Sequence, residues 1–394
     1  MYPHDSYLRI EGNFKTAGNA DVANNSAVAF INNGLMRLFS NARYILGGEV
    51  LEYFENAGIT TTIHNYLSKS RNYSGDSWFW APDRGTAAAN ATNKYWRIRN
   101  IFTNPQAAAG VWYFSAILPL NAIFSFCNDY KKAIYGMQHK ISLTRTNNTS
   151  ALLRTNAAIG ASGNYLVLVA LANDIVVSIT TLKWAMRQAV PSLIKEQEVL
   201  SIIEDKEPVQ LAFLNKRLES TNVPAAASFK WNLQLASGVE RPRFIVVGFQ
   251  TGRGADQTTN NASFDLNGLN VTDAYIVLNG LRYPYSNFGA NYATKTYTKW
   301  YYEYLNFYNK YNNDNKSEAC LSYYDFITVA PLYVFDVSNQ RERTKNSEID
   351  VTLTMTFAAA APANTMAYAA TYYDSTYTLT GDVGKQIIKL FNYD

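Results

Sequence analysis

The sequence predicts an all-β fold with a few short helices, arranged as two tandem jelly-roll β-sandwiches. Three observations support this prediction: a strand that ends in a glycine turn occurs twice, apolar and polar residues alternate in several segments, and long polar loops separate these segments. Alternation with a period of two is typical of strands buried on one face. Strands at this spacing with few helices indicate Greek-key sandwiches, and about eight strands in two packed sheets make a jelly roll.

The duplication is visible in matched segments of the two halves. ARYILGGE ends its strand at Gly48 and AYIVLNGL ends its strand at Gly280, with an offset of 232 residues (280 − 48). LPLNAIF and APLYVFD share a proline, Pro119 and Pro331, with an offset of 212 residues (331 − 119). A repeat of this kind indicates two copies of one β-domain.

The strands after these prolines agree in the same way. Ile141 in HKISLTR precedes Leu353 in VTLTMTF by 212 residues (353 − 141), and a first-half loop longer by 20 residues (232 − 212) would absorb the difference between the offsets. We therefore expect an N-terminal jelly roll over residues 1–191 and a C-terminal jelly roll over residues 192–394, with the boundary near Pro191.

Further strand signals follow in chain order. The run YLVLVALA at residues 165–172 is too short for the ~20 apolar residues of a membrane span, so it predicts a buried strand. Residues 174–184 are rich in β-branched side chains, which favour strands. Residues 229–235 and 350–357 place apolar side chains on one face, whereas residues 244–249 are apolar throughout, as in a central strand covered on both faces.

Three helices are expected. Residues 60–67 follow the first glycine turn, and residues 297–311 follow the second with aromatic side chains at spacings of three and four. Residues 192–206 lie between two prolines, with Ser192 as a candidate N-cap. The helix after each glycine-turn strand strengthens the case for a duplication.

Composition excludes several function classes. A hydrophobic fraction of 47% excludes wholesale disorder. Charged residues make up 17%, below the ~25% of typical soluble domains, which indicates a surface largely covered by neighbouring molecules. The net charge of +4 gives no strong electrostatic attraction for nucleic acid, so we expect weak, non-specific DNA binding at most.

The cysteines and histidines point away from an enzyme. Cys127 and Cys320 cannot build a disulfide framework, and His4, His64 and His139 have no metal-ligand spacing. We therefore predict no catalytic, cofactor-binding or metal-binding residues, and no cofactor. The N-terminal residues lack the apolar core of a signal peptide, so we expect synthesis inside the host cell without one, and no membrane span.

Long stretches of the chain resemble the double jelly-roll major capsid proteins of polinton-like and adintovirus-like eukaryotic double-stranded DNA viruses, which also survive as endogenous copies. The resemblance covers roughly residues 30–375 and rests on ordered motifs of structural character. The motifs are FINNGLMRLFSNARYILGGEVLEYFENAGITTTIHNYLS (30–68), ERPRFIVVGFQTGR (240–253), LNVTDAYIVLNGLRYPYSNF (269–288), PLYVFDVSNQRE (331–342) and APANTMAYAATYYD (361–374).

The resemblance implies a structural function in the virion. Such proteins form hexon-like homotrimers, and two similar domains in each of three chains give a pseudo-hexameric capsomer that tiles an icosahedral capsid around double-stranded DNA. The implied partners are the other chains of the homotrimer, neighbouring capsomers, penton and minor capsid proteins, and the encapsidated DNA without strong sequence-specific contact.

A second interpretation from another class stays open at this point. The chain could be a glycan-binding or receptor-binding β-sandwich protein, such as a viral attachment subunit, and its aromatic loop with Trp78, Phe79 and Trp80 would then contact the ligand. Isolated monomers that bind glycans would support that reading, whereas six-sided blocks would support the capsid protein.

The aromatic helix at 297–311 is the candidate interface. Trp300 lies on an aromatic side that we expect to seal the C-terminal jelly roll, while Tyr302 and Phe307 are expected to point elsewhere. A helix that is aromatic on more than one face is usually covered on more than one face. We therefore predict that Tyr302 and Phe307 contact a neighbouring domain or subunit.

Overall fold

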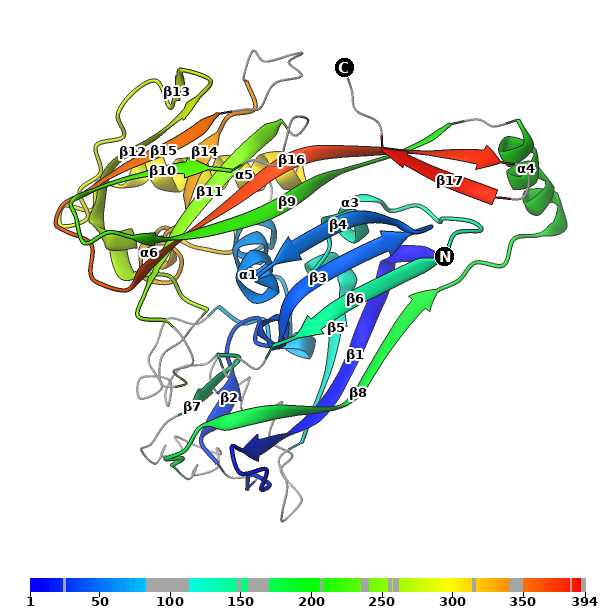
Figure 1. Ribbon diagram of the computed structural model, residues 1–394, viewed down its shortest axis with the longest axis horizontal. Coiled ribbons are helices and arrows are strands. Elements are labelled where there is room, and N and C mark those ends of the chain that lie inside the picture. Colours follow the sequence, from blue (N-terminus) through cyan, green and yellow to red (C-terminus); the bar gives the residue numbers. More distant parts are fainter. Residues whose placement is uncertain are drawn as a thin grey trace.

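A computed structural model describes most of the chain, and the strands fall into sets on either side of residue 191. The described residues are 1–23, 26–82, 113–146, 150–154, 170–205, 208–234, 241–253, 257, 262–313, 317–339, 350–382 and 385–390. The expected strand at 165–172 lies mostly outside these residues. Figure 1 shows the C-terminal half above the N-terminal half, with α1 and α5 close to the junction.

Among its described residues, the N-terminal half has two three-stranded sheets and one two-stranded sheet, with strand orders β5-β1-β8, β4-β3-β6 and β2-β7. Its elements are β1 (Tyr2–Thr16), β2 (Val28–Phe30), β3 (Phe39–Leu46), β4 (Glu49–Glu55), α1 (Ala57–Ser68), β5 (Tyr113–Pro119), α3 (Ser125–Asp129), β6 (His139–Arg145), β7 (Leu152–Arg154) and β8 (Ile175–Arg187).

The C-terminal half contains a complete jelly roll. Strands β9 to β16 divide between the sheets β9-β16-β11-β14 and β10-β15-β12-β13, and β17 pairs with the distal part of β16. Its elements are α4 (Leu193–Glu204), β9 (Val209–Val223), β10 (Ser228–Leu233), β11 (Pro242–Thr251), β12 (Val271–Leu278), β13 (Leu281–Tyr283), α5 (Thr298–Asn312), α6 (Tyr323–Thr328), β14 (Tyr333–Asp336), β15 (Val351–Phe357), β16 (Thr365–Asp382) and β17 (Lys385–Leu390).

Strand pairing confirms the duplication residue by residue. In the N-terminal half Tyr44 pairs with Ile141, and in the C-terminal half Ile276 pairs with Leu353. These residues differ by the offsets read from the sequence, 232 (276 − 44) and 212 (353 − 141). The pairs Ala42–Leu143 and Leu46–His139 correspond in the same way to Ala274–Met355 and Leu278–Val351.

The two glycine turns are also equivalent. Gly47 and Gly48 adopt positive φ angles of 58° and 100°, and Asn279 and Gly280 adopt positive φ angles of 47° and 83°. Two consecutive positive φ angles match the right-handed twist of a tight hairpin, and glycine reaches this region without a steric cost. The hairpins β3–β4 and β12–β13 therefore have the same type of turn.

The predicted equivalence of Pro119 and Pro331 was wrong. Pro119 is the last residue of β5, whereas Pro331 precedes β14. The pairings instead make β5 the counterpart of β14, because each is an edge strand beside β1 or β11. Short apolar segments around a proline carry too little pattern to distinguish a strand end from a strand start.

The other expected strands and helices that lie within the described residues are present. Residues 174–184 and 229–235 correspond to β8 and β10, residues 244–249 to the buried strand β11, and residues 350–357 to β15. The three predicted helices correspond to α1, α4 and α5. One continuous apolar core runs through both halves. No strand ladder of the described residues crosses residue 191, and the division into 1–191 and 192–394 stays a prediction.

Candidate interaction surfaces and the junction between the halves

Helix α5 buries one face inside its own half. Trp300 is fully buried, and its ring lies 4.9 Å from that of Tyr333 on β14 and 4.3 Å from that of Phe288. Tyr302 is 64% exposed. Trp300 therefore belongs to the core, as expected from the sequence, and Tyr302 is accessible to another molecule.

The structure corrects the expected position of Phe307. This side chain is fully buried, and its ring lies 4.8 Å from Phe244 on β11 and 5.0 Å from Tyr372 on β16. Seven residues complete about two helical turns, so Phe307 lies on the same face as Trp300. The sequence analysis assigned Phe307 to the wrong face of the helix, because this side chain packs inside the chain.

A different set of α5 residues contacts the N-terminal half. The hydroxyl of Tyr304 donates to the Tyr66 carbonyl at 2.9 Å, and the Asn312 side-chain amide donates to the Ser68 carbonyl at 3.0 Å. Both acceptors lie near the end of α1, where intrahelical partners run out. The sequence analysis did not name Tyr304 or Asn312 for such a contact, and a contact of Tyr302 with a neighbouring domain or subunit stays a prediction.

The centre of the junction is a fully buried ion pair. Lys216 on β9 and Glu52 on β4 have no exposed side-chain surface, and Lys216 Nζ lies 2.5 Å from Glu52 Oε1. Lys216 also donates to the Ser125 hydroxyl at 2.9 Å, while the backbone amides of Ser125 and Phe126 donate to Glu52 at 3.1 and 3.2 Å. These additional hydrogen bonds offset the cost of removing both charges from water.

The sequence carries a signal for this pair that was overlooked. Leu214, Lys216 and Leu218 lie on one face of β9, so a lysine interrupts an apolar row. Such a residue is seldom fully buried unless it is paired. Its partner is 164 positions away, which no local pattern reveals.

The charge of Lys216 also affects the pKa of two neighbouring side chains. Burial, followed by the charge of Lys216, lowers the pKa of His64 well below its usual value and lowers the pKa of Lys69 to about 8. His64 lies on α1, with its ring 5.4 Å from that of Tyr311 on α5. The junction therefore favours a neutral His64, which packs as an aromatic side chain.

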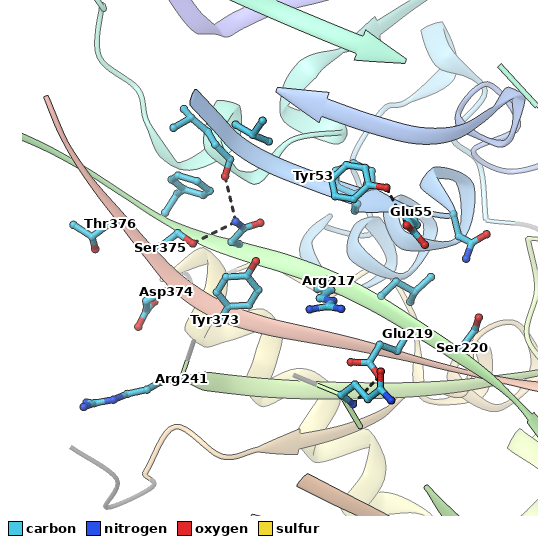
Figure 2. A pocket seen from close by; sticks show the side chains of 18 of the residues that line it. Tyr53, Glu55, Arg217, Glu219, Ser220, Arg241, Tyr373, Asp374, Ser375 and Thr376 are labelled. Atoms are coloured by element: carbon cyan, nitrogen blue, oxygen red, sulfur yellow. Dashed lines mark hydrogen bonds between the residues drawn. The ribbon is translucent and has the colours of Figure 1, made fainter. Parts of the chain in front are cut away.

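A groove of 1290 Å³ opens beside this junction. Figure 2 shows its wall formed by β4, with Tyr53 and Glu55, and by β9 and β16, with Arg217, Glu219 and Ser375. The Tyr53 hydroxyl donates to Glu55 at 2.9 Å, and burial raises the pKa of Glu219.

The groove carries charges of both signs. Arg217 and Arg241 line it together with Glu55, Glu219 and Asp374. A phosphate backbone is attracted by a surface that is mainly positive. The acidic side chains of this groove oppose that attraction, so the groove does not suit nucleic acid. The geometry suits a contact with polypeptide, where mixed charges and aromatic side chains are common.

The aromatic loop expected to contact a glycan is inside the core. Trp78, Phe79 and Trp80 are all buried, and the rings of Trp78 and Trp80 stack at 5.4 Å. The Phe79 ring stacks on Phe30 at 4.9 Å. Because none of the three faces solvent, they offer no stacking surface to a sugar.

Helix α4 begins with two strongly exposed apolar side chains. Leu193 is 80% exposed and Ile194 is 71% exposed, and Val190 lies just before them. The helix stands at one end of the molecule beside β17 (Figure 1). Contiguous exposed apolar side chains mark interaction surfaces in soluble proteins.

The remaining candidates for chemistry are packed inside the fold. Burial raises the pKa of the Cys320 thiol to about 12, and burial also raises the pKa of Cys127, so both thiols are poor nucleophiles. His4 contacts the Cys127 carbonyl, and His139 contacts the Tyr44 hydroxyl. Within the described residues no group of three or more metal-ligating side chains is found. No helix there is long and apolar enough to cross a membrane.

Comparisons with known proteins agree with this architecture. A family model described as a double jelly roll-like domain matches residues 28–376. No curated protein matches the chain. A chain of the Sputnik virophage structure, solved by cryo-electron microscopy, is similar with a TM-score of 0.53 and 11% identity, over 99% of this chain and 82% of that chain.

The crystal structure of the mavirus major capsid protein is also similar. The TM-score is 0.50 with 13% identity, over 98% of this chain and 83% of that chain. At such identities the likeness establishes the fold alone. Together with the family match, it confirms the double jelly roll predicted from the sequence.

Proposed function

Because this chain belongs to the double jelly roll-like family, we propose that it is a structural major capsid protein without catalytic activity. In this proposal, homotrimers form pseudo-hexameric capsomers, and the capsomers tile an icosahedral shell around double-stranded DNA. The protein is then located in the virion, in the capsid.

One observation carries the proposal: the two halves have β-ladders of the same register and are joined by a buried junction. Three such chains around a threefold axis present six similar walls, which suit a hexagonal lattice. The trimer contact joins different surfaces of adjacent chains and closes after three copies. The ion pair between Glu52 and Lys216 supports this geometry by holding the halves of each chain in one arrangement.

The exposed surfaces suit contacts between chains. Tyr302 on α5 and the apolar side chains of α4 are accessible, whereas most large apolar side chains are buried. We assign Tyr302 to a contact with a neighbouring subunit. Neighbouring capsomers, penton proteins and minor capsid proteins are the other expected partners, and many weak contacts over a shell add to a stable assembly.

The encapsidated DNA is expected to make no strong sequence-specific contact, because the net charge is only +4. The glycan-binding alternative has lost the feature on which it rested, since Trp78, Phe79 and Trp80 are buried.

Electron microscopy of the purified protein tests the proposal. We expect six-sided particles with a threefold axis, alone or in hexagonal arrays. Separate monomers at micromolar concentration, combined with saturable binding to immobilised glycans, would contradict the capsid assignment and favour an attachment protein.

A further inference from the structure

The side chain of His64 is buried where the two halves meet. It lies on α1 and is only 1% exposed. Its ring lies 5.4 Å from that of Tyr311 on α5 and 6.0 Å from that of Tyr372 on β16. Both tyrosines belong to the C-terminal half, so the imidazole is part of the packed contact between the halves.

The buried imidazole suits the neutral state alone. Among the described residues, Nδ1 of His64 has no hydrogen-bond partner, and neither has the Tyr372 hydroxyl. Protonation would add an N–H donor at Nδ1 and a positive charge, at a position that offers this atom no partner. A buried charge without a partner is far more costly than a buried neutral ring.

The carboxylates of the junction are already engaged. Glu52 accepts from Lys216 and from two backbone amides of α3. Asp129, at the end of α3, accepts from the Tyr311 hydroxyl at 3.3 Å and from the Leu214 amide at 3.0 Å. Neither carboxylate is therefore free to neutralise a positive charge on His64.

The nearby cations oppose a further positive charge. Burial, followed by the charges of Lys216 and Lys69, lowers the pKa of His64 well below its usual value. In an open junction water surrounds the ring and screens these charges, so the imidazole regains an ordinary pKa of about 6.5. The open form therefore binds a proton at a pH at which the closed form does not.

We propose that His64 makes the junction between the two halves acid-sensitive, because a proton binds its imidazole only when the junction is open. The contacts released by acid are those that cross the junction, such as Lys216 with Glu52 and Tyr304 with Tyr66. Each half keeps its own sheets, since no strand ladder of the described residues crosses residue 191. This inference concerns the single chain and does not depend on capsomer assembly.

The size of the effect follows from proton linkage. The contribution of neutral His64 to the closed junction is complete above about pH 6.5 and is lost as the pH falls below that value. Between pH 7.5 and pH 5 the ratio of open to closed junction should rise about 30-fold, if the closed form binds no proton at His64 in this range.

Hydrogen exchange of two backbone amides measures the opening. The Arg71 amide donates to the Glu318 carbonyl at 2.9 Å, and the Leu214 amide donates to Asp129 at 3.0 Å, so both hydrogen bonds cross the junction. Relative to exchange in an unfolded peptide at the same pH, both amides should be about 10- to 30-fold less protected at pH 5 than at pH 7.5.

The amides of β15 distinguish opening of the junction from unfolding of the whole chain. They lie inside the C-terminal jelly roll, so at both pH values they should stay about 10-fold or more better protected than the Arg71 and Leu214 amides. Equal protection of all these amides at pH 5 would mean that the chain unfolds as one unit, which contradicts a separate acid-sensitive junction.

Matched variants assign the effect to His64. His64→Phe keeps an aromatic ring beside Tyr311 and Tyr372 but cannot bind a proton, so the loss of protection at pH 5 should shrink to less than about 3-fold. His64→Gln, which is neutral and polar, should behave in the same way and serves as a second test if the phenylalanine disturbs the packing.

His139→Val is the control. His139 contacts Tyr44 within the N-terminal half, so its replacement should leave the 10- to 30-fold loss at the junction amides unchanged. Wild-type protection that is equal at pH 7.5 and pH 5 would overturn the proposal. The same loss in both His64 variants as in the wild type would overturn it as well.

Discussion

The N-terminal and C-terminal jelly rolls have the same strand register but differ in how well their interiors are covered. Ile141 and Leu353 occupy equivalent positions in their ladders, yet Leu353 is fully buried and Ile141 is half-buried. The C-terminal half has β9 and β10 along the edges of β16 and β15, and no described strand does this in the N-terminal half.

This difference in coverage shows that strand register and side-chain burial have different causes. Register depends on alternation within each strand and on the glycine turn that joins β3 to β4 and β12 to β13, all of which are local in sequence. Burial depends on which strands lie alongside, which is a property of the whole assembly. Equivalent sequence positions can therefore have equal register and unequal stability.

The largest effect is expected from breaking the link between the two halves. Lys216→Ala leaves the Glu52 carboxylate buried without its partner, so we expect a loss of about 3–5 kcal/mol in the free energy of unfolding. Urea denaturation followed by circular dichroism measures it.

The control for this variant is the double substitution Lys216→Met with Glu52→Leu, which removes both charges. It should recover most of the lost stability, since replacing a buried pair by apolar side chains is often close to neutral. An equal loss in both variants would show that packing, not the unpaired charge, causes the effect.

Matched truncations of equivalent residues sharpen the comparison next. Leu353→Ala removes a fully buried side chain and should cost about 2–5 kcal/mol, whereas Ile141→Ala should cost about half as much or less, because its site is already partly open to water. Denaturation midpoints of the two variants, measured side by side, give the ratio. Equal costs would mean that the N-terminal sandwich is as well covered as the C-terminal one.

The pH dependence of stability provides a third test. Burial lowers the pKa of His139 to about 4, below the ~6.5 of an unfolded chain. Between these values the unfolded state binds the proton first, so His139 lowers stability as the pH falls from about 6.5 to about 4.

Its counterpart Val351 does not titrate, so His139→Val makes the two ladders alike at this position. Urea midpoints at pH 7, 6 and 5 should then fall less steeply than in the wild type. Parallel pH profiles would exclude His139 as a source of the dependence.

The smallest effect on folding is expected at the surface of the C-terminal half. Tyr302→Ser changes an exposed side chain and should alter stability by less than about 0.5 kcal/mol. If Tyr302 contacts a neighbouring subunit, the same change should weaken association about 10-fold, as for a tyrosine near the centre of an interface. Tyr285→Ser, at another exposed tyrosine, is the control. Equal association of the two variants would place the subunit contact elsewhere.

Sequence patterns predicted the features that depend on local periodicity. The positions of Gly48 and Gly280 gave both hairpins, and the offsets of 232 and 212 are reproduced in the observed pairs. Trp300 was correctly placed in the core. These succeeded because each rests on alternation, helical spacing or a turn residue within one element.

Features that depend on distant segments were missed or wrong. Phe307 was assigned to an outer face because neither β11 nor β16, which cover it, is adjacent to α5 in sequence. The same reason hid the burial of Trp78 beneath neighbouring elements and the pairing of Glu52 with Lys216. Such contacts follow from the packing of whole sheets, which no single-sequence pattern contains.

The mass of the purified protein in solution tests the proposed capsomer most directly. Sedimentation equilibrium at micromolar concentration should give three chains of 44.2 kDa in one particle, with no change on mild dilution. Obligate interfaces of the expected kind bury on the order of 2,000–5,000 Å², which keeps such a particle intact. A single species of 44.2 kDa would contradict the homotrimer and with it the pseudo-hexameric capsomer.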